Sequence, residues 1–441
     1  MIDELERKLD SLDPEEREKA LELLLEEVEN GKVILPAPTE RLNLHCHTFF
    51  SYNSYGYSPS KFAWLARKAG LAVAGIMDFD VLDGLEEFLK ASRMLGLKAC
   101  VGMETRVFVP EFSDKVINSP GEPGIAYHIG VGFPKAQMHG WLKEFLVNLK
   151  KIAQERNRAL TERVNAYLSP IELNYEQDVI PLTPAGNPTE RHISLAFARK
   201  AGEVFTDKKK LLQFWAEKLG SDFEACDLPE GRNFLDAIRA KTMKRGGMGY
   251  VQPDAGAFPK MEKTNEFILA SGGIPTLAWL DGTSEGEKEM ERLLEVAMKS
   301  EVAAINIIPD RNYTPGVKDE KLTNLYRIVE LAEEQNLPVV VGTEMNSSGQ
   351  ELVDDFDSEE LSPLLPVFLK GGYIVYAHSV LQQRAGLGYT SRWAQENFAS
   401  GEARMGFFKK LGELLEPGKE KFLDGLLEDV SPKEILKIFE G

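Results

Sequence analysis

Short apolar runs alternate with helical segments along most of the chain. Eight runs have the composition of buried strands: 42–47, 71–77, 99–109, 127–133, 274–280, 302–308, 337–345 and 373–379. Apolar residues recur at helical spacing between several of them, as in 58–70, 286–300 and 319–336. Such alternation is typical of a parallel α/β sheet. Seven or eight units favour a closed or distorted barrel over a doubly wound sheet, and no GxGxxG turn supports a dinucleotide fold.

The regular alternation stops between about residues 140 and 265. A long helical pattern over 143–168 is followed by Pro- and Asn-rich turns and by further helical segments. We interpret 141–265 as a mainly helical insertion that divides the barrel into 41–140 and 266–390. Residues 1–40 are predicted to be a helical extension, with Asp13-Pro14 starting a helix. Residues 391–441 are predicted to be a helical tail.

Composition narrows the classes of partner and compartment. The 441 residues include 52 Lys and Arg against 70 Asp and Glu, a net charge of 52 − 70 = −18. This charge disfavours an extended nucleic-acid surface but leaves room for a local phosphate pocket. Three cysteines (Cys46, Cys100 and Cys226) make no disulfide framework. The charged N-terminus and the lack of an apolar run of ~18 residues favour a cytoplasmic protein without a membrane segment. Oligomeric state is left open.

His45 and His47 end the first apolar run. Residues i and i+2 of a strand point to the same side, so both imidazoles are expected to face one way. Two imidazoles at the carboxyl end of a barrel strand are a good start for a metal site. A pair of hydrogen-bonded core histidines is the alternative.

Further ligand-type residues stand at the ends of the other runs: Asp78 and Asp80, Glu104, His128, Glu344 and His378. Each one alone can be read as a strand-end cap or an ion-pair partner. Together they favour a site at the carboxyl ends of the strands, where α/β barrels place their chemistry. A mixture of carboxylate and imidazole suits Zn²⁺, Mn²⁺ or Fe.

The same positions resemble the PHP (polymerase and histidinol phosphatase) superfamily, and within it the branch of predicted metal-dependent phosphoesterases. The resemblance covers about residues 41–350. The segments that carry it occur in the family's order: HCHTFFS, GYSPSKFAWLARKAGLAVAGIMDFDVLDGLEEF, VGMETRV, AYHIGVGF, GGIPTLAWL and LPVVVGTEMNS. The resemblance implies a distorted (β/α)7 barrel, two or three metal ions at its carboxyl face and hydrolysis of phosphoesters.

Carried over by motif, the resemblance implies metal ligation by His45, His47, Glu104 and His128. Glu344 stands where the family has Asp and keeps a carboxylate. Other ligands are replaced: Phe79 and Asn346 stand in place of histidines, Trp279-Leu280 in place of His-Pro, and 51–54 has no carboxylate.

Five remaining donors cannot saturate three ions, because each ion needs about four or more donors. An ion beside bulky apolar Phe79 or Trp279 would also lack polar partners. We therefore predict at most one tightly bound ion, held by His45, His47, Glu104 and Glu344. His128 is expected nearby or weakly bridging.

The remaining site candidates concern substrate and proton transfer. Arg158, Arg191 and His192, on the insertion, are candidates to hold a phosphate over the barrel mouth; a solvated helix face is the alternative. His378 is a candidate pocket residue. Asp78 is the candidate catalytic carboxylate, acting by orienting a ligand imidazole, and Asp80 is a second such candidate.

These features favour a metal-dependent hydrolase of phosphoesters on a small molecule or nucleotide, with a reduced metal site. The missing ligands favour the alternative, a non-catalytic PHP-like binding or regulatory protein. Another hydrolytic reaction at a one-metal site is a third option, since barrels support many chemistries.

Overall fold

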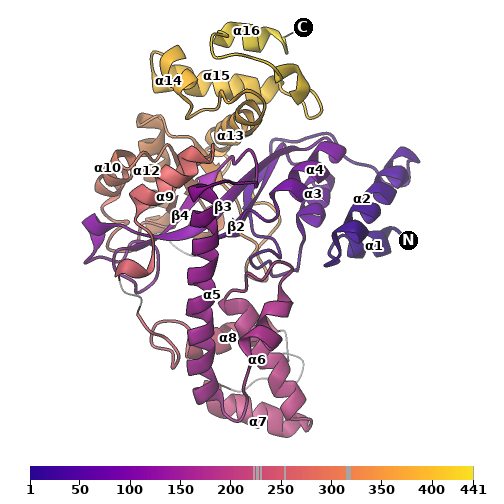
Figure 1. Ribbon diagram of the computed structural model, residues 1–441, viewed down its shortest axis with the longest axis vertical. Coiled ribbons are helices and arrows are strands. Elements are labelled where there is room, and N and C mark those ends of the chain that lie inside the picture. Colours follow the sequence, from indigo (N-terminus) through magenta and orange to yellow (C-terminus); the bar gives the residue numbers. More distant parts are fainter. Residues whose placement is uncertain (222–223, 225–227, 229–230, 253–254, 314–318, 441) are drawn as a thin grey trace.

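A seven-stranded sheet curled into a nearly closed barrel forms the centre of the molecule (Figure 1). The computed structural model describes residues 1–221, 224, 228, 231–252, 255–313 and 319–440, so Cys226 lies outside the described residues. The strands follow one another in chain order: β1 Leu42–Cys46, β2 Val73–Phe79, β3 Lys98–Phe108, β4 Ile125–Val131, β5 Ile274–Trp279, β6 Ala304–Ile307 and β7 Val339–Val341. The predicted α/β barrel class is therefore confirmed.

The alternation of apolar runs and helices predicted a parallel sheet, but the sheet is mixed. β4 runs antiparallel to both β3 and β5, while the other neighbouring pairs are parallel. β3 and β4 are joined directly, without a crossover helix, through a loop that contains a short 3-10 turn at Pro110–Phe112. Parallel pairing needs a long crossover, so this short connection returns the chain in the opposite direction.

The barrel closes between β1 and β7 at the end of the sheet that carries His45 and His47. His47 N donates to Glu344 O over 2.8 Å, and Glu344 N donates to His45 O over 2.7 Å. A Cβ at Gly342 would lie 2.3 Å from His45 N, so only glycine allows these two backbone segments to approach this closely.

Helices cover the outside of the barrel and its amino end. The outer helices are α3 Pro59–Lys68, α4 Leu85–Leu95, α9 Met261–Ala270, α10 Met290–Lys299 and α12 Asp319–Glu334, with a short α11 Pro309–Tyr313 after β6. Helix α13 (Leu365–Ala385) packs against the start of β7, and a Cβ at Gly371 would lie 1.9 Å from Val339 O. The run 373–379, predicted as a strand, is therefore part of a buried helix. A short apolar run has the same composition in both settings.

The remaining helices lie outside the sheet (Figure 1). The N-terminal pair is α1 Ile2–Lys8 and α2 Pro14–Glu29, the latter capped by Asp13 as predicted. The C-terminal helices are α14 Arg392–Asn397, α15 Gly401–Leu414 and α16 Pro432–Lys437. None of the helices in the described ranges is long and apolar enough to cross a membrane.

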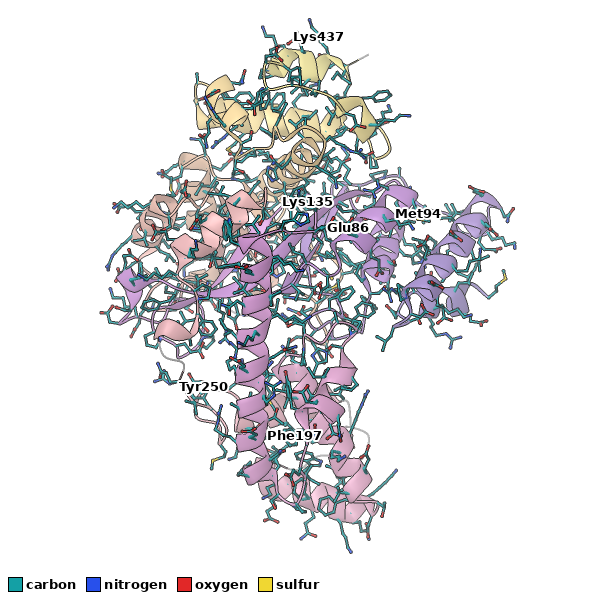
Figure 2. The ribbon with its side chains drawn as sticks, viewed as in Figure 1. Glu86, Met94, Lys135, Phe197, Tyr250 and Lys437 are labelled. Carbon is teal, nitrogen blue, oxygen red and sulfur yellow. The ribbon has the colours of Figure 1, made fainter. Side chains whose placement is uncertain are left out.

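Between β4 and β5 the chain forms α5 Trp141–Leu168, α6 Glu190–Val204, α7 Lys208–Leu219 and α8 Arg232–Thr242. Helix α5 begins on the barrel, where Phe145 stacks on Phe267 of α9, and ends in a separate apolar core with Val164 and Leu168. Phe197 of α6 is fully buried in that core (Figure 2). These helices stand at the carboxyl face of the barrel. The segment boundaries given above stay predictions.

Candidate active site

Three buried donor atoms meet at the carboxyl end of the barrel. His47 Nε2 lies 3.2 Å and His45 Nε2 3.5 Å from Glu104 Oε2, and the three side chains are at most 6% exposed. Among the described residues, these three side chains form a group that could hold a metal ion, because their ligand atoms lie within 4.8 Å of one another. None of the three atoms has a hydrogen-bond partner among those residues. Burying polar atoms without a hydrogen-bond partner costs free energy of folding, and a bound ion would satisfy all three atoms.

The opposite nitrogens of the two imidazoles are held by neighbours that fix the tautomer. His45 Nδ1 lies 3.0 Å from Asn306 Oδ1, an acceptor, while the amide nitrogen of Asn306 donates to Val340 O. His47 Nδ1 lies 3.1 Å from Ser51 Oγ, and the Ser51 hydroxyl donates to Asp78 over 2.6 Å. Because that hydroxyl proton is already used, His47 Nδ1 must be the donor. In the neutral rings both Nε2 lone pairs therefore point toward Glu104.

This donor set fits a divalent metal ion. Two imidazole nitrogens and one carboxylate oxygen suit Zn²⁺, Mn²⁺ or Fe, and orientation of each imidazole by a second group is usual for metal ligands. Burial raises the pKa of Glu104, but imidazoles that carry a proton toward it outweigh burial and bring its pKa down to about 2, so the carboxylate is ionised. Burial lowers the pKa of His45, while Glu104 and Glu344 raise it above its usual value. Protons therefore compete with a metal for His45.

Glu344 lies beside this cluster without joining it. Both its carboxylate oxygens accept hydrogen bonds from Arg311 Nη2, over 2.9 and 3.1 Å. Burial raises the pKa of Glu344, but Arg311 lowers it below the usual value. Glu344 and Met345 have φ values of +59° and +54°, and Asp80, at the end of β2, has +60°. Non-glycine residues in this left-handed region are uncommon and gather at functional sites.

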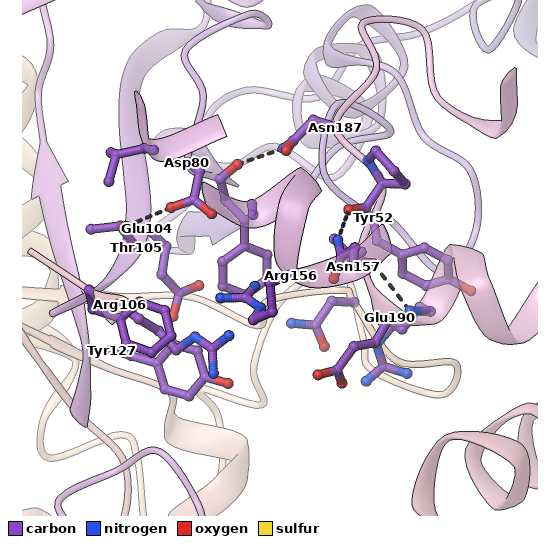
Figure 3. Close-up of a pocket in the computed structure, with 18 of the residues that line it drawn as sticks. Tyr52, Asp80, Glu104, Thr105, Arg106, Tyr127, Arg156, Asn157, Asn187 and Glu190 are labelled. Carbon is purple, nitrogen blue, oxygen red and sulfur yellow. Dashed lines mark hydrogen bonds between the residues drawn. The ribbon is translucent and has the colours of Figure 1, made fainter. Parts of the chain in front are cut away.

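A pocket of about 300 Å³ opens over Glu104, between the barrel and the insertion (Figure 3). Among the described residues its walls carry six cationic side chains: Arg106, Arg156, Arg191, Arg239, Lys244 and Arg311. They carry four carboxylates: Asp80, Glu104, Glu190 and Glu344. In a chain with a net charge of −18 this is a marked local excess of cations. Such a pocket suits an anionic ligand.

Two arginines, one from β3 and one from α5, stand over the same aromatic ring in the pocket. The guanidinium carbons of Arg106 and Arg156 lie 4.4 and 5.4 Å from the centre of the Phe258 ring. Arg106 pairs with Glu122 over 2.9 Å. Arg156 makes no ion pair with any described residue. Burial and the neighbouring Arg106 lower its pKa to about 10, so the pair of like charges favours an anion between them.

The insertion side of the pocket is cross-linked by ion pairs. Glu190 binds Arg239 over 3.0 Å and Lys244 over 2.8 Å, which joins α6 to α8 and to the loop after it. Arg191 bonds Ser347 over 2.6 Å and stands over the ring of Tyr52, 5.6 Å from its centre. Arg191 thus links the insertion to the loop that holds Tyr52 and to the loop that holds Ser347. It was predicted to bind substrate, and it does line the pocket.

Three other predicted residues lie elsewhere. His128 points outward, where its Nε2 lies 2.5 Å from Asn265 of α9, because the inner positions of β4 belong to Tyr127 and Ile129. His378 lies on α13 at the amino end of the barrel, with its Nε2 against Gly272 O and its Nδ1 accepting from Tyr389 N. Arg158 is paired with Glu176 on the exposed side of α5. None of them belongs to the cluster or lines the pocket, so His128 is not proposed further as a metal ligand, nor are Arg158 and His378 as substrate residues.

The other predicted positions are placed as follows. His192 caps the start of α6 by accepting from Thr189 N, and it borders a second hollow on the far side of Tyr52. Asp78 binds Thr48 and Ser51 and so acts on His47 through Ser51; its catalytic role stays a prediction. Asp80 receives the Thr105 hydroxyl instead of holding an imidazole. Phe79 stacks on His47, with ring centres 4.5 Å apart.

Sequence reasoning missed most of the cationic wall, although two members could have been found. Arg106 follows Glu104 by two positions on β3, and period-two alternation places both on the inner face. Arg156 shares the face of α5 with Leu149, Ile152 and Ala153, at helical spacings of seven, four and three, whereas Arg158 does not. No local signal marks Arg239, Lys244 or Arg311, because tertiary packing alone brings their loops and helices to the pocket.

Comparison with known proteins adds the following. No protein-family model matches the sequence, and no curated protein matches it. One similar solved structure is an amidohydrolase from Chromobacterium violaceum with bound sulfate and no metal, at 17% identity over 74% of this chain and 96% of that chain, with a TM-score of 0.49. Another is a proposed metal-dependent phosphoesterase from Bifidobacterium adolescentis, at 18% identity over 76% and 98%, with a TM-score of 0.47. At this level of similarity, function has to be inferred from the site itself.

Proposed function

We propose that the protein is a divergent PHP-type, metal-dependent hydrolase that cleaves phosphoesters of a small molecule or nucleotide. One observation carries the proposal: three buried, unbonded donor atoms of His45, His47 and Glu104 adjoin a pocket lined by six cations. The order of the sequence motifs and the seven-stranded barrel support the family assignment. A cytoplasmic location and a small phosphorylated substrate belong to the same proposal.

The chain's own residues divide the work. His45, His47 and Glu104 would hold the ion, while Asn306 and the Ser51–Asp78 pair keep the imidazole lone pairs directed at it. Arg106 and Arg156 would bind phosphoryl oxygens and orient the ester toward Glu104. Tyr127 and Phe79 exclude water from the apolar side of the pocket. A bound divalent ion would lower the pKa of a water and offset charge on phosphoryl oxygens.

A non-catalytic protein that binds an anionic metabolite is the second candidate. Phe79 covers one face of His47, and Arg311 occupies the Glu344 carboxylate. The described residues of the centre therefore supply three protein donors, fewer than a multi-metal hydrolase uses. Such a centre is compatible with binding alone, so hydrolysis has to be measured.

The experiment is a hydrolysis screen with controlled metal content. The purified chain is stripped with chelator, reloaded separately with Zn²⁺, Mn²⁺ or Fe²⁺, and assayed for phosphate release from small phosphomonoesters, phosphodiesters and nucleotides. Glu104→Gln keeps the shape but removes a ligand charge, and the exposed Glu111→Gln is the matched control. We expect metal-dependent release that is lost in Glu104→Gln and retained in Glu111→Gln. Binding without turnover under every metal would favour the second candidate, and neither binding nor turnover would contradict both.

A further inference from the structure

Glu344 lies beside the proposed metal ligands, held there by its backbone. Its backbone bridges β1 through hydrogen bonds to His45 and from His47, so its side chain starts next to both imidazoles. Its left-handed backbone, with φ +59°, is maintained by the surrounding contacts at the end of β7. The side chain is 7% exposed and lines the same pocket as Glu104.

That carboxylate is already occupied. Arg311 Nη2 reaches both oxygens, and Gln350 Nε2 lies 3.4 Å from Oε2. The described residues hold one metal-ligand group, in which the ligand atoms of His45, His47 and Glu104 lie within 4.8 Å of one another, and Glu344 is not part of it. A charge-assisted pair of this kind is strong in a half-buried setting, so a metal must displace Arg311 before it can bind Glu344.

The rest of the Arg311 guanidinium is free for another partner. Its Nε and Nη1 form no hydrogen bond with any described residue, the side chain is 42% exposed, and it lines the pocket. Guanidinium presents its donors in a fixed plane that matches the oxygens of a carboxylate on one edge and of a phosphoryl group on the other.

From this geometry we propose that Arg311 is a built-in cation that takes the place of a second metal ion. It withholds Glu344 from the ion held by His45, His47 and Glu104, and it presents its free N–H groups to an oxyanion of the substrate. This inference rests on the proposed metal centre. Guanidinium carries no exchangeable water, so Arg311 would offset charge on the substrate, and a bound ion would still be needed to activate a water.

The test measures metal affinity and stoichiometry by Zn²⁺ titration calorimetry on the wild-type chain, Arg311→Ala, Glu344→Gln and the double variant. Arg311→Gln serves if Arg311→Ala does not fold, and Arg327→Ala, on the exposed side of α12, is the control for loss of a surface arginine. Wild type should bind one ion. Releasing Glu344 should give Arg311→Ala at least about tenfold tighter binding, because the freed carboxylate can then bind the ion directly. The gain should vanish when Glu344→Gln is added.

Two results would overturn the inference. One is an Arg311 variant whose affinity and stoichiometry match the wild type. The other is an equal gain in the Glu344→Gln background, because the gain would then come from removing a positive charge near the ion and not from Glu344. A wild-type chain that binds no ion at all would instead contradict the metal centre itself, so the two failures are distinguishable.

Discussion

His45 and His47, on the inner side of the barrel, contrast with His128, which points outward to α9, and with His378, which lies on α13 at the amino end of the barrel. All four imidazoles are buried, and three of them lie on a strand or directly after one. The first two present Nε2 atoms to a carboxylate within 3.5 Å. His128 and His378 bind an amide and backbone groups instead, and burial lowers the pKa of each to about 4.

Burial and residue type therefore do not distinguish the proposed metal ligands from the other histidines. What separates the pairs is where the second ring nitrogen points. The Nδ1 atom of His128 is also unbonded among the described residues, but it belongs to no group of three ligand-type residues there. A free lone pair becomes a site only when other donors converge on it.

Among these variants, we expect His47→Ala to lose the most Zn²⁺ affinity. Removing one of three protein ligands should weaken Zn²⁺ binding by more than about 100-fold, because changes even at supporting residues cost 10–100-fold. His128→Gln, which keeps an amide donor for Asn265, should leave Zn²⁺ affinity unchanged in the folded fraction. Calorimetric titration of both variants decides the matter. Equal losses would mean that the contrast between the two faces is false.

The next largest effect concerns two arginines on one helix. Arg156→Ala should lower kcat/KM for the phosphoester by about 100-fold, because a charge-assisted hydrogen bond in a half-buried site contributes about 1.5–3 kcal/mol. Arg158→Ala should change kcat/KM by less than about twofold, since an exposed ion pair contributes little. Steady-state kinetics on both proteins gives the ratio. A larger effect at Arg158 would place the substrate on the other face of α5.

Ser51→Ala should have a smaller effect, through the imidazole it orients. Loss of the hydroxyl removes the acceptor for His47 Nδ1 and should weaken metal binding by about tenfold. Ser54→Ala, in the same loop, loses only a bond to Met345 O and is the control. The two affinities are compared by competition with a metal chelator. Equal values for both variants would remove the Asp78–Ser51–His47 chain from the account.

The smallest effect is on acid stability. The pKa of His128 is about 4 in the folded chain and near 6.5 when unfolded, because burial disfavours the imidazolium. Its contribution to stability is therefore complete above pH 6.5 and is lost as pH falls toward 4, by roughly 1.4 kcal/mol per pH unit at most. Urea unfolding between pH 7 and 4.5 should show a shallower loss for His128→Gln than for wild type. Parallel curves would show that His128 takes up no proton on unfolding.

The barrel was predictable because its strands are continuous apolar runs separated by amphipathic helices. The reading of 373–379 as a strand failed because α13 is buried on nearly all sides and shows no helical stripe. The direction of β4 could not be predicted, since pairing direction depends on the connection and not on strand composition.

The cluster of His45, His47 and Glu104 was easier to predict than the pocket around it. His45, His47 and Glu104 each stand at a strand end, where period and position suffice to place them. On β4 we expected His128 to face the inside of the barrel, but its neighbour Tyr127 does so. Tyr127 therefore lines the pocket, while His128 faces α9. The pairing of Glu344 with Arg311 joins residues 33 positions apart and leaves no trace in either local segment.

The anomalous difference map of a crystal grown with Zn²⁺ or Mn²⁺ would show directly how many ions bind at the barrel mouth and which residues hold them. We predict a single ion per chain, bound by His45 Nε2, His47 Nε2 and Glu104, with Arg311 still on Glu344. Two or more ions at the barrel mouth, an ion bound by Glu344 in the wild-type chain, or no peak at these three residues would contradict it.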